Sequence, residues 1–321
     1  MNQKLAQKIE KLFPTVQSDK NIAPYTTFGV GGNVRFYLPV KTKLELIQAL
    51  EKAISNKLPF VILAGGSNVI FSDKTLAKLV IHCLPPKNKT KAIQIDDDLV
   101  MVPAGVALAD LIKQSLKAGL AGLESLSGIP GTVGGAVVGN AGAYGQSISD
   151  HLVSLEIFDG RRVRTISKKE ARFVYRGSNF KVKPWFVLEA TFNLKNGERA
   201  TLEAKAKEII KIRNKKYHRG LKCPGSFFKN VLVAEVPKKV LAKIDQVKII
   251  DGKIPTGYLL EAVSARGLRE GQIAVADFHG NLLMNLGGGT CAQTKKLATK
   301  LKRLVKNRFG ITLEEEVRYM L

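Results

Sequence analysis

The segment GLESLSGIPGTVGGAVVGNAGAYG, residues 122–145, contains eight glycines and three alanines in twenty-four positions. Side chains this small leave volume beside the backbone, and protein interiors are packed too densely to leave such volume empty. Four β-branched apolar residues, Ile129, Val133, Val137 and Val138, also make the segment more apolar than a flexible linker. We therefore expect a large flat ligand to lie against this backbone, with hydrogen bonds from Ser127, Thr132 and Asn140.

A second glycine cluster, GGSN at residues 65–68, follows a short apolar run at residues 60–63 that is predicted to be a buried strand. Successive backbone N–H groups at the end of a strand can hold a diphosphate. The spacing is neither GxGxxG nor GxxxxGK[ST], so no Rossmann or P-loop site is predicted. Taken alone, such a cluster is also typical of a tight turn.

The sequence around GGSN predicts alternating strands and a helix, which is locally an α/β arrangement. Residues 26–40 have the pattern of a glycine-rich turn and a strand, residues 43–56 that of a helix, and residues 76–82 that of a further strand. In the helix we expect one apolar face, formed by Leu44, Ile47, Leu50 and Ile54.

Further along the chain, residues 108–118 are predicted to be a helix, and a hairpin is expected to turn at Asp159 and Gly160. A composition change near residue 200 indicates a domain boundary. The last helix is predicted to end at Gly310, with an apolar stripe of Leu297, Leu301, Leu304 and Val305.

Composition limits the class of protein. The chain has 321 residues, 45% hydrophobic and 24% charged, which indicates a soluble globular protein of two or three domains without membrane spans or a signal peptide. Its formal charge of +24 predicts polyanionic partners, which could be nucleic acid, anionic lipid or phosphorylated small molecules. We expect no metal site and a reduced, cytoplasmic protein, because three widely spaced cysteines stand at Cys83, Cys223 and Cys291.

Three further segments carry polar groups that could take part in chemistry. FVYRGSNFK, residues 173–181, has an arginine that could hold a carboxylate in bidentate fashion. KCPGSFFKN, residues 222–230, has a serine after a glycine, but the GxSxG motif of a hydrolase is absent. LEEEVRYML, residues 313–321, has three glutamates before an expected strand.

Together and in this order, the five segments resemble the bacterial UDP-N-acetylenolpyruvoylglucosamine reductases, flavoenzymes of peptidoglycan synthesis. The resemblance covers residues 26–318 and includes KIPTGYLLEAVSARG, residues 253–267, and DFHGNLLMN, residues 277–285. It implies an α+β fold, with an FAD-binding module of the vanillyl-alcohol-oxidase (PCMH) type in two subdomains, residues 1–85 and 86–200, and a C-terminal α+β substrate domain, residues 201–321.

The resemblance implies a ping-pong reaction. NADPH, the co-substrate, reduces FAD, and the reduced flavin then passes hydride to the vinylic carbon of a UDP-sugar enolpyruvyl ether. On the matching positions, Arg176 and Glu316 would bind the substrate carboxylate and stabilise an enolate-like intermediate, and Ser226 would donate the proton. Further substrate contacts are expected from Tyr175, Lys229, Asn230 and Lys253.

The resemblance also assigns both glycine clusters to FAD. The GGSN backbone would hold the pyrophosphate, and residues 128–136 would lie along the flavin and its phosphates. Neither cluster contains His or Cys for covalent attachment, so noncovalent FAD is expected. The expected cofactor-binding residues are Gly65, Gly66, Ser67, Asn68, Gly128, Pro130, Gly131, Thr132, Gly134, Gly135 and Ala136.

The chain departs from the family pattern without losing a reactive group. The short interval between Arg176 and Ser226 resembles the shorter form of the family, which lacks an inserted loop whose tyrosine closes over substrate. Five residues differ from those usual in the family, so the resemblance predicts the geometry of the substrate site less closely. They are Ala64, Pro224, Val231, Tyr258 and Gly280.

Other functions fit parts of the sequence. Another FAD oxidoreductase of the same fold would need neither Ser226 nor Glu316, and an inactive homologue would not need to keep every reactive residue type. A nucleic-acid-binding protein could use basic residues 210–222 and 295–308, but aromatic residues are only 7% and no recognition motif is present. We expect these segments to be solvated helix faces of a monomer without nucleic-acid or membrane partners.

Overall fold

The computed structural model describes residues 3–218 and 220–321. Unit 1 comprises Met1–Lys20, Val34–Gly65 and Ala77–Lys215, and unit 2 comprises Asn21–Asn33, Gly66–Leu76 and Lys216–Leu321. Both units are therefore discontinuous in sequence, because two short segments of the N-terminal third belong with the C-terminal part. The division into three domains at residues 85 and 200 stays a prediction.

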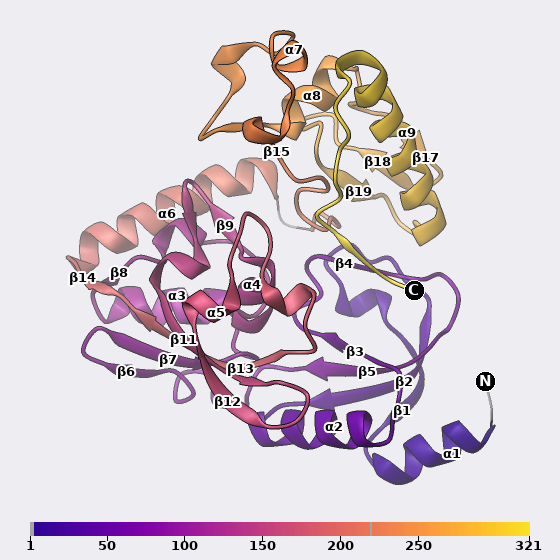
Figure 1. Cartoon of the computed structure of the whole chain (residues 1–321), viewed down its shortest axis with the longest axis vertical. Coiled ribbons are helices and arrows are strands. Elements are labelled where there is room, and N and C mark those ends of the chain that lie inside the picture. The colour runs from indigo at the N-terminus through magenta and orange to yellow at the C-terminus, as the bar shows by residue number, and fades with distance from the viewer. Residues whose placement is uncertain (1–2, 219) are drawn as a thin grey trace. The chain divides into compact units, whose positions relative to one another are not determined.

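The N-terminal part of unit 1 is a four-stranded sheet in the order β1-β2-β5-β3, in which β3 and β5 run parallel. Figure 1 shows helix α2 lying along this sheet. Phe36, Leu50 and Ile81 are fully buried in the core between them. The elements are α1 (Gln3–Leu12), β1 (Gln17–Asn21), β2 (Asn33–Val40), α2 (Lys43–Ser55), β3 (Phe60–Leu63) and β5 (Leu76–Cys83).

Helix α2 confirms the helix predicted for residues 43–56 but not its predicted face. It begins after Thr42, whose hydroxyl accepts a hydrogen bond from the Glu45 N–H in a capping box. Leu44 is 63% exposed, so its predicted place on a buried face is wrong. The buried stripe has the spacing i, i+3, i+4, i+7 and consists of Leu46, Ala49, Leu50 and Ala53. A prediction based on large apolar residues misses its two alanines.

The second part of unit 1 is an antiparallel sheet in the order β12-β11-β13-β7-β6. The predicted hairpin is confirmed, because the Asp159 carboxylate accepts hydrogen bonds from the N–H groups of Arg161 and Arg162 in the turn between β11 and β12. The principal elements are β6 (Gln94–Asp96), β7 (Leu99–Pro103), α3 (Leu108–Lys117), α4 (Val133–Gly139), β11 (Leu152–Phe158), β12 (Val163–Ser167), β13 (Phe186–Asn193) and α6 (Arg199–Lys216).

Several short elements complete unit 1. Strand pairs β9–β10 and β8–β14 are antiparallel, and α5 caps the hairpin after β12. Their bounds are β8 (Leu120–Ala121), η2 (Glu124–Leu126), β9 (Gly142–Ala143), β10 (Gln146–Ser147), η3 (Ile148–His151), α5 (Lys168–Ala171), η4 (Asn179–Lys181) and β14 (Lys195–Asn196).

Unit 2 has its own core around helix α9, which packs against α8 and the β17-β18-β19 sheet (Figure 1). Strand β20 pairs in parallel with β4, so the end of the chain joins the strand that follows GGSN. The elements are η1 (Ala23–Tyr25), β4 (Val69–Phe71), β15 (Val231–Leu232), η5 (Val233–Glu235), α7 (Lys238–Leu241), η6 (Gln246–Lys248), β16 (Lys253–Ile254), α8 (Thr256–Ala262), β17 (Arg269–Glu270), β18 (Ile273–Val275), β19 (Leu283–Asn285), α9 (Cys291–Phe309) and β20 (Arg318–Met320).

Helix α9 confirms the predicted final helix and its stop. Gly310 has φ 75°, the left-handed conformation that ends a helix at little cost for glycine. At the other end, the Asp73 carboxylate accepts hydrogen bonds from the Cys291 and Ala292 N–H groups at 2.7 and 2.9 Å. This contact ties the segment after β4 to the first turn of α9, where a negative charge is favourable.

The structure also bears on membrane and cysteine chemistry. Within residues 3–218 and 220–321, no helix is both long and apolar enough to span a bilayer. All three cysteines are free thiols. The described part of the chain contains no group of three or more His, Cys, Asp or Glu side chains suited to a metal ion.

Candidate active site

The two glycine clusters of the sequence come into direct backbone contact within unit 1. A Cβ added to Gly65 would stand 2.6 Å from the Gly131 Cα and 3.3 Å from the Thr132 backbone nitrogen. The first distance is shorter than real Cβ contacts and its partner is backbone, so only glycine fits at this point. Because Gly65 follows strand β3 and Gly131 precedes helix α4, the contact places the predicted pyrophosphate loop against the predicted flavin segment.

The flavin segment is held by a second backbone pairing. Val133 and Gly134 donate their N–H groups to the carbonyls of Val106 and Ala104, both at 2.9 Å. A Cβ at Gly134 would lie 2.8 Å from the Ala104 Cβ, so glycine is again required by the neighbouring chain. The Thr132 hydroxyl accepts the N–H of Gly135 and starts helix α4. The backbone of this segment is thus rigidly placed.

The GGSN loop continues into unit 2, where its carbonyls are occupied by protein donors. The Thr27 N–H donates to the Gly66 carbonyl at 3.1 Å, the Thr27 hydroxyl to that of Ser67 at 3.3 Å, and the Arg318 N–H to that of Asn68 at 3.0 Å. Gly66 has φ 64°, which favours glycine. The carbonyls of the loop thus bind protein donors, an arrangement compatible with an anion bound by the N–H groups of the loop.

A buried hydroxyl supports a ligand beside these backbones. Ser127 is 3% exposed, and its Oγ has no hydrogen-bond partner among the described residues. A buried polar group without a partner costs about 1 to 3 kcal/mol, so a ligand atom is its expected partner. Together with the glycine cradle, this hydroxyl fits a flat cofactor with polar edges such as FAD.

Arg176 lies in a tight turn of unit 1. The backbones of Val174 and Gly177 exchange two hydrogen bonds, 3.0 and 3.1 Å long, and Arg176 between them has φ 53°. Its guanidinium donates from Nη2 to the Gly142 carbonyl at 2.9 Å and stands 5.5 Å from the ring centroid of Tyr175. A strained non-glycine residue held by several contacts is typical of a functional site.

The Arg176 turn is anchored to the end of helix α4. The Asn140 side chain donates to the Val174 carbonyl at 2.9 Å, and the Ser178 hydroxyl donates to the Val138 carbonyl at 2.8 Å. Asn140 itself ends α4 in the left-handed conformation. The structure therefore joins YRGSN to the glycine-rich segment, as a site with arginine beside a flavin requires.

Ser226 and Glu316 lie on adjacent extended segments of unit 2. Phe228 and Glu315 form an antiparallel bridge, and the Glu316 N–H donates to the Phe227 carbonyl at 2.9 Å. Phe227 and Phe228 are fully buried, which fixes the segment that carries Ser226. Two predicted catalytic residues thus come from neighbouring backbones although ninety positions separate them in sequence.

Asn68 links the GGSN loop to this pair of segments. Its side-chain amide donates to the Glu316 carbonyl at 3.0 Å. The Asn68 side chain is therefore engaged in holding Glu316, and its predicted contribution to the cofactor is limited to its backbone.

Asn281 holds the Ser226 segment from its other side, a role that sequence reasoning did not assign. Its side chain accepts the Phe228 N–H at 2.9 Å and donates to the Phe228 carbonyl at 2.8 Å, while its own carbonyl accepts the Phe227 N–H at 3.1 Å. Asn281 is 2% exposed. The sequence signal that could have indicated this role is an asparagine placed directly before the apolar residues of DFHGNLLMN.

The three substrate-binding residues predicted in unit 2 also lie on neighbouring segments. Strand β15 after Lys229 and Asn230 pairs with β16, which begins at Lys253. Asn230 accepts the Thr256 N–H at 3.1 Å, whereas the Lys229 ammonium forms an ion pair with Glu314. Tyr175 and Arg176 belong to unit 1, and Ser226 and Glu316 to unit 2. The predicted site residues therefore belong partly to unit 1 and partly to unit 2.

The unusual Gly280 has a local reason. A Cβ there would stand 2.8 Å from the Glu261 Cγ and 2.9 Å from the Gly257 carbonyl oxygen. An alanine at this position would therefore displace helix α8. The structure explains this departure from the family pattern by packing rather than by substrate binding.

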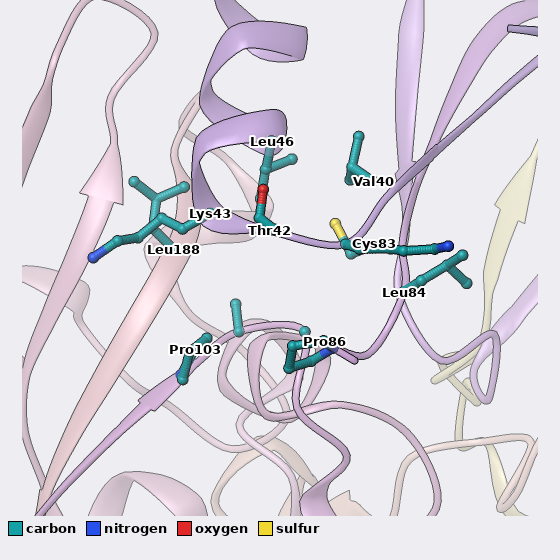
Figure 2. Close-up of a pocket in the computed structure, with 12 residues that line it drawn as sticks. Val40, Thr42, Lys43, Leu46, Cys83, Leu84, Pro86, Pro103 and Leu188 are labelled. Atoms are coloured by element: carbon teal, nitrogen blue, oxygen red, sulfur yellow. The ribbon is translucent and has the colours of Figure 1, made fainter. Parts of the chain in front are cut away.

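A separate pocket of unit 1 encloses about 640 Å³, open solvent included, and is shown in Figure 2. Thr42, Cys83 and Leu188 are among its lining residues, and none of the predicted site residues is. Burial raises the pKa of the Cys83 thiol to about 12, so this cysteine is not a nucleophile at neutral pH. Lys43 is bound by Glu156 and Glu189 and offers no free charge to a phosphate.

A buried histidine, His82, and a half-buried one, His279, make stability depend on acid pH. Burial lowers the pKa of His82 to about 4, and burial with the nearby Lys216 ammonium lowers that of His279 to about 4. The unfolded chain takes up the proton near pH 6.5, so the free energy of unfolding should fall from there towards pH 4, by about 3 kcal/mol for His82 alone. Urea unfolding across this range should show a shallower loss in His82→Gln than in the wild-type protein; equal slopes would contradict the assignment.

Comparisons with known proteins agree with this geometry. Residues 34–166 match the model of an FAD binding domain, and residues 216–320 match that of the UDP-N-acetylenolpyruvoylglucosamine reductase C-terminal domain. A UDP-N-acetylenolpyruvoylglucosamine reductase of Solibacter usitatus is 38% identical over 306 residues, which cover 95% of this chain and 96% of the relative. One of Rubrobacter xylanophilus is 32% identical and covers 97% of both chains.

A solved structure agrees as well. The crystal structure of the UDP-N-acetylenolpyruvylglucosamine reductase of Thermus caldophilus matches with a TM-score of 0.73 and 28% identity, over 95% of this chain and 99% of that chain. The predicted fold class, an FAD-binding module followed by a C-terminal α+β domain, is confirmed. The chain belongs to the UDP-N-acetylenolpyruvoylglucosamine reductase family.

Proposed function

We propose that this chain reduces the enolpyruvyl ether of UDP-N-acetylglucosamine to UDP-N-acetylmuramate for peptidoglycan synthesis, with FAD as cofactor and NADPH as co-substrate. The observation that carries the proposal is the backbone contact of Gly65 with Gly131, which only glycines permit. This contact makes one cradle of the two clusters that were expected to bind FAD. Family membership over 95% of the chain supports the same reaction.

The chain's part in cofactor binding is to hold FAD noncovalently. The N–H groups of the GGSN loop would take the pyrophosphate, and the backbone from Gly128 to Ala136 would lie along the isoalloxazine and phosphates. The Ser127 hydroxyl is one further group that could bind a polar edge of the cofactor. Bound FAD supplies hydride chemistry, accepting a hydride from NADPH and delivering it to the substrate double bond.

Arg176 and Glu316 are proposed to bind and polarise the substrate carboxylate. As hydride adds to the terminal vinylic carbon, electron density moves toward the carboxylate, and a fixed guanidinium stabilises that charge. The hydrogen bond from Arg176 to Gly142 restricts its side chain, so little reorganisation is needed when substrate binds. Tyr175 would support the same carboxylate or the nicotinamide of NADPH.

Ser226 is proposed to complete the reduction. Its Oγ–H gives a proton to the carbon next to the carboxylate, and the serine oxygen then recovers a proton from solvent. An aliphatic hydroxyl is a weak acid, but an enolate carbon is basic enough to take its proton when the donor is fixed nearby. Lys229, Asn230 and Lys253 are proposed contacts to the UDP-sugar.

The test follows the two half-reactions separately. Under anaerobic conditions, NADPH should bleach the yellow holoprotein, and the enolpyruvyl substrate should restore the colour with one equivalent of UDP-N-acetylmuramate formed. An alcohol or hydroxy-acid oxidase of the same fold would instead be bleached by its alcohol substrate and not by NADPH. A protein that takes up no FAD would contradict the proposal altogether.

We further propose that the protein is a cytoplasmic monomer. Three free thiols are consistent with a reducing compartment, and the nucleotide substrates are cytoplasmic metabolites. Light scattering of the holoprotein after size exclusion should give the mass of one chain, 35.1 kDa plus FAD.

A further inference from the structure

A buried tyrosine–histidine pair lies beside the end of strand β3, which leads into the GGSN loop. His82 is near the end of strand β5 and pairs in parallel register with Leu63, the last residue of β3. His82 is 6% exposed and Tyr37, on the neighbouring strand β2, is 3% exposed. Neither side chain has a part in the proposed reaction, so a polar pair at this depth needs another explanation.

The two side chains form a chain of hydrogen bonds that ends on the loop. The Tyr37 hydroxyl lies 2.7 Å from the His82 Nδ1, with the rings 5.6 Å apart and inclined at 71°. The His82 ring is also hydrogen-bonded to the backbone of Ala64, and because this contact acts to raise the pKa of His82, the Ala64 group is its carbonyl. Because a carbonyl only accepts, the ring nitrogen that faces Ala64 carries the proton, and Nδ1 therefore accepts the Tyr37 O–H.

Burial keeps this arrangement in one protonation state. The pKa of His82 is lowered to about 4 by burial, so the ring is neutral at pH 7 and holds a single proton on Nε2. A neutral ring between a hydroxyl donor and a carbonyl acceptor satisfies every polar group of the pair. The tautomer is thus set by the Ala64 carbonyl, and the Tyr37 hydroxyl donates to the remaining ring nitrogen.

We infer that Tyr37 and His82 are positioning residues of the cofactor loop, which together fix the direction of the Ala64 carbonyl and thereby of the Gly65 N–H. In a planar trans peptide, the carbonyl of one residue and the N–H of the next point in opposite directions. A carbonyl held by His82 therefore turns the Gly65 N–H away from the core. The inference rests on the proposed function in so far as the ligand of this loop is FAD.

The contact between Gly65 and Gly131 gives this orientation its importance. A Cβ at Gly65 would lie only 2.6 Å from the Gly131 Cα, so the two backbones are in close contact and a rotated Gly65 peptide would disturb that contact. If the hydrogen bond to Ala64 is lost, we expect the peptide to sample other orientations and the pyrophosphate to lose a donor. The effect should appear in cofactor retention before it appears in overall folding.

The test compares FAD release from diluted holoprotein, followed by the rise of flavin fluorescence. One hydrogen bond corresponds to about a 2- to 10-fold change in an equilibrium, so we expect Tyr37→Phe and His82→Leu to weaken FAD binding by at least that amount. His82→Gln, which keeps a donor for Ala64 and an acceptor for Tyr37, should recover much of the loss.

Leu79→Ala is the matched control, because Leu79 is fully buried in the same strand and belongs to its apolar core. It should lower the melting temperature and leave FAD release unchanged. In 15N-labelled wild-type holoprotein, the His82 ring should show the Nε2–H tautomer that the Ala64 carbonyl requires. Unchanged FAD release in Tyr37→Phe and His82→Leu, or a wild-type ring protonated on Nδ1, would overturn the inference while leaving the proposed function intact. A wild-type protein without FAD affinity would overturn the proposed function itself.

Discussion

Ser226→Ala should slow the reduction of the enolpyruvyl substrate by about 10²- to 10⁴-fold, the usual contribution of a positioned proton donor. Bleaching of the flavin by NADPH should remain within about twofold of the wild-type rate, because that half-reaction needs no proton from the serine. The measurement is anaerobic stopped-flow spectroscopy of each half-reaction. The structural reason for a local effect is that Phe227 and Phe228 hold the segment from buried positions that the substitution does not change.

Two comparisons sharpen this experiment. Ser226→Cys keeps an acidic proton at the same position and should recover part of the rate lost in Ser226→Ala. Asn281→Leu, which removes the hydrogen bonds that hold the Phe228 backbone, should slow the same half-reaction although Asn281 donates no proton to substrate. If both half-reactions fall equally in Ser226→Ala, the serine is not the proton donor.

Gly65→Ala should weaken FAD binding by about 5- to 150-fold, equivalent to about 1 to 3 kcal/mol for an overpacked site. The added methyl would lie 2.6 Å from the Gly131 Cα, and both partners are backbone, so neither can rotate out of the way. The loop must then move away from the flavin segment. Titration of the apoprotein with FAD, followed by quenching of flavin fluorescence, measures the change.

Gly197→Ala is the matched control in the same unit. Its added methyl would meet the ends of the Leu202 and Ala121 side chains at 3.2 to 3.6 Å, and a leucine side chain can yield by a small rotation. FAD affinity should therefore stay within about twofold of wild type. Wild-type affinity in Gly65→Ala would mean that the loop and the flavin segment do not need their close contact.

Several local elements of the structure agree with predictions made from short sequence patterns. The helix at residues 43–56, the Asp159–Gly160 hairpin and the stop at Gly310 were all predicted from spacing and from turn or cap residues. The prediction of the buried face of α2 was wrong because its two alanines can be assigned to the core only when the opposing core is known. A stripe of small residues is ambiguous in a sequence, since alanine is found both inside and outside proteins.

The site was predictable as a set of segments but not as a geometry. The glycine clusters, YRGSN, GSFFKN and LEEEVR identified the family and the residue types that its reaction needs. Nothing in those segments indicated that Asn68 would hold the Glu316 backbone across 248 positions, or that Asn281 would hold the Ser226 segment. Such contacts depend on which distant backbones become neighbours.

The sequence by itself determined the family, the cofactor class and the reactive residues, because side-chain chemistry and short spacings are local properties of the chain. Only the tertiary structure explains why particular positions require a certain residue type or protonation state. Gly65 has no unusual backbone angle, and it must be glycine because Gly131 lies against it. His82 could equally have been a surface residue in a strand, and it acquires its neutral state from burial and its single tautomer from the Ala64 backbone. Both requirements arise from excluded volume and desolvation, which exist only once the chain has folded.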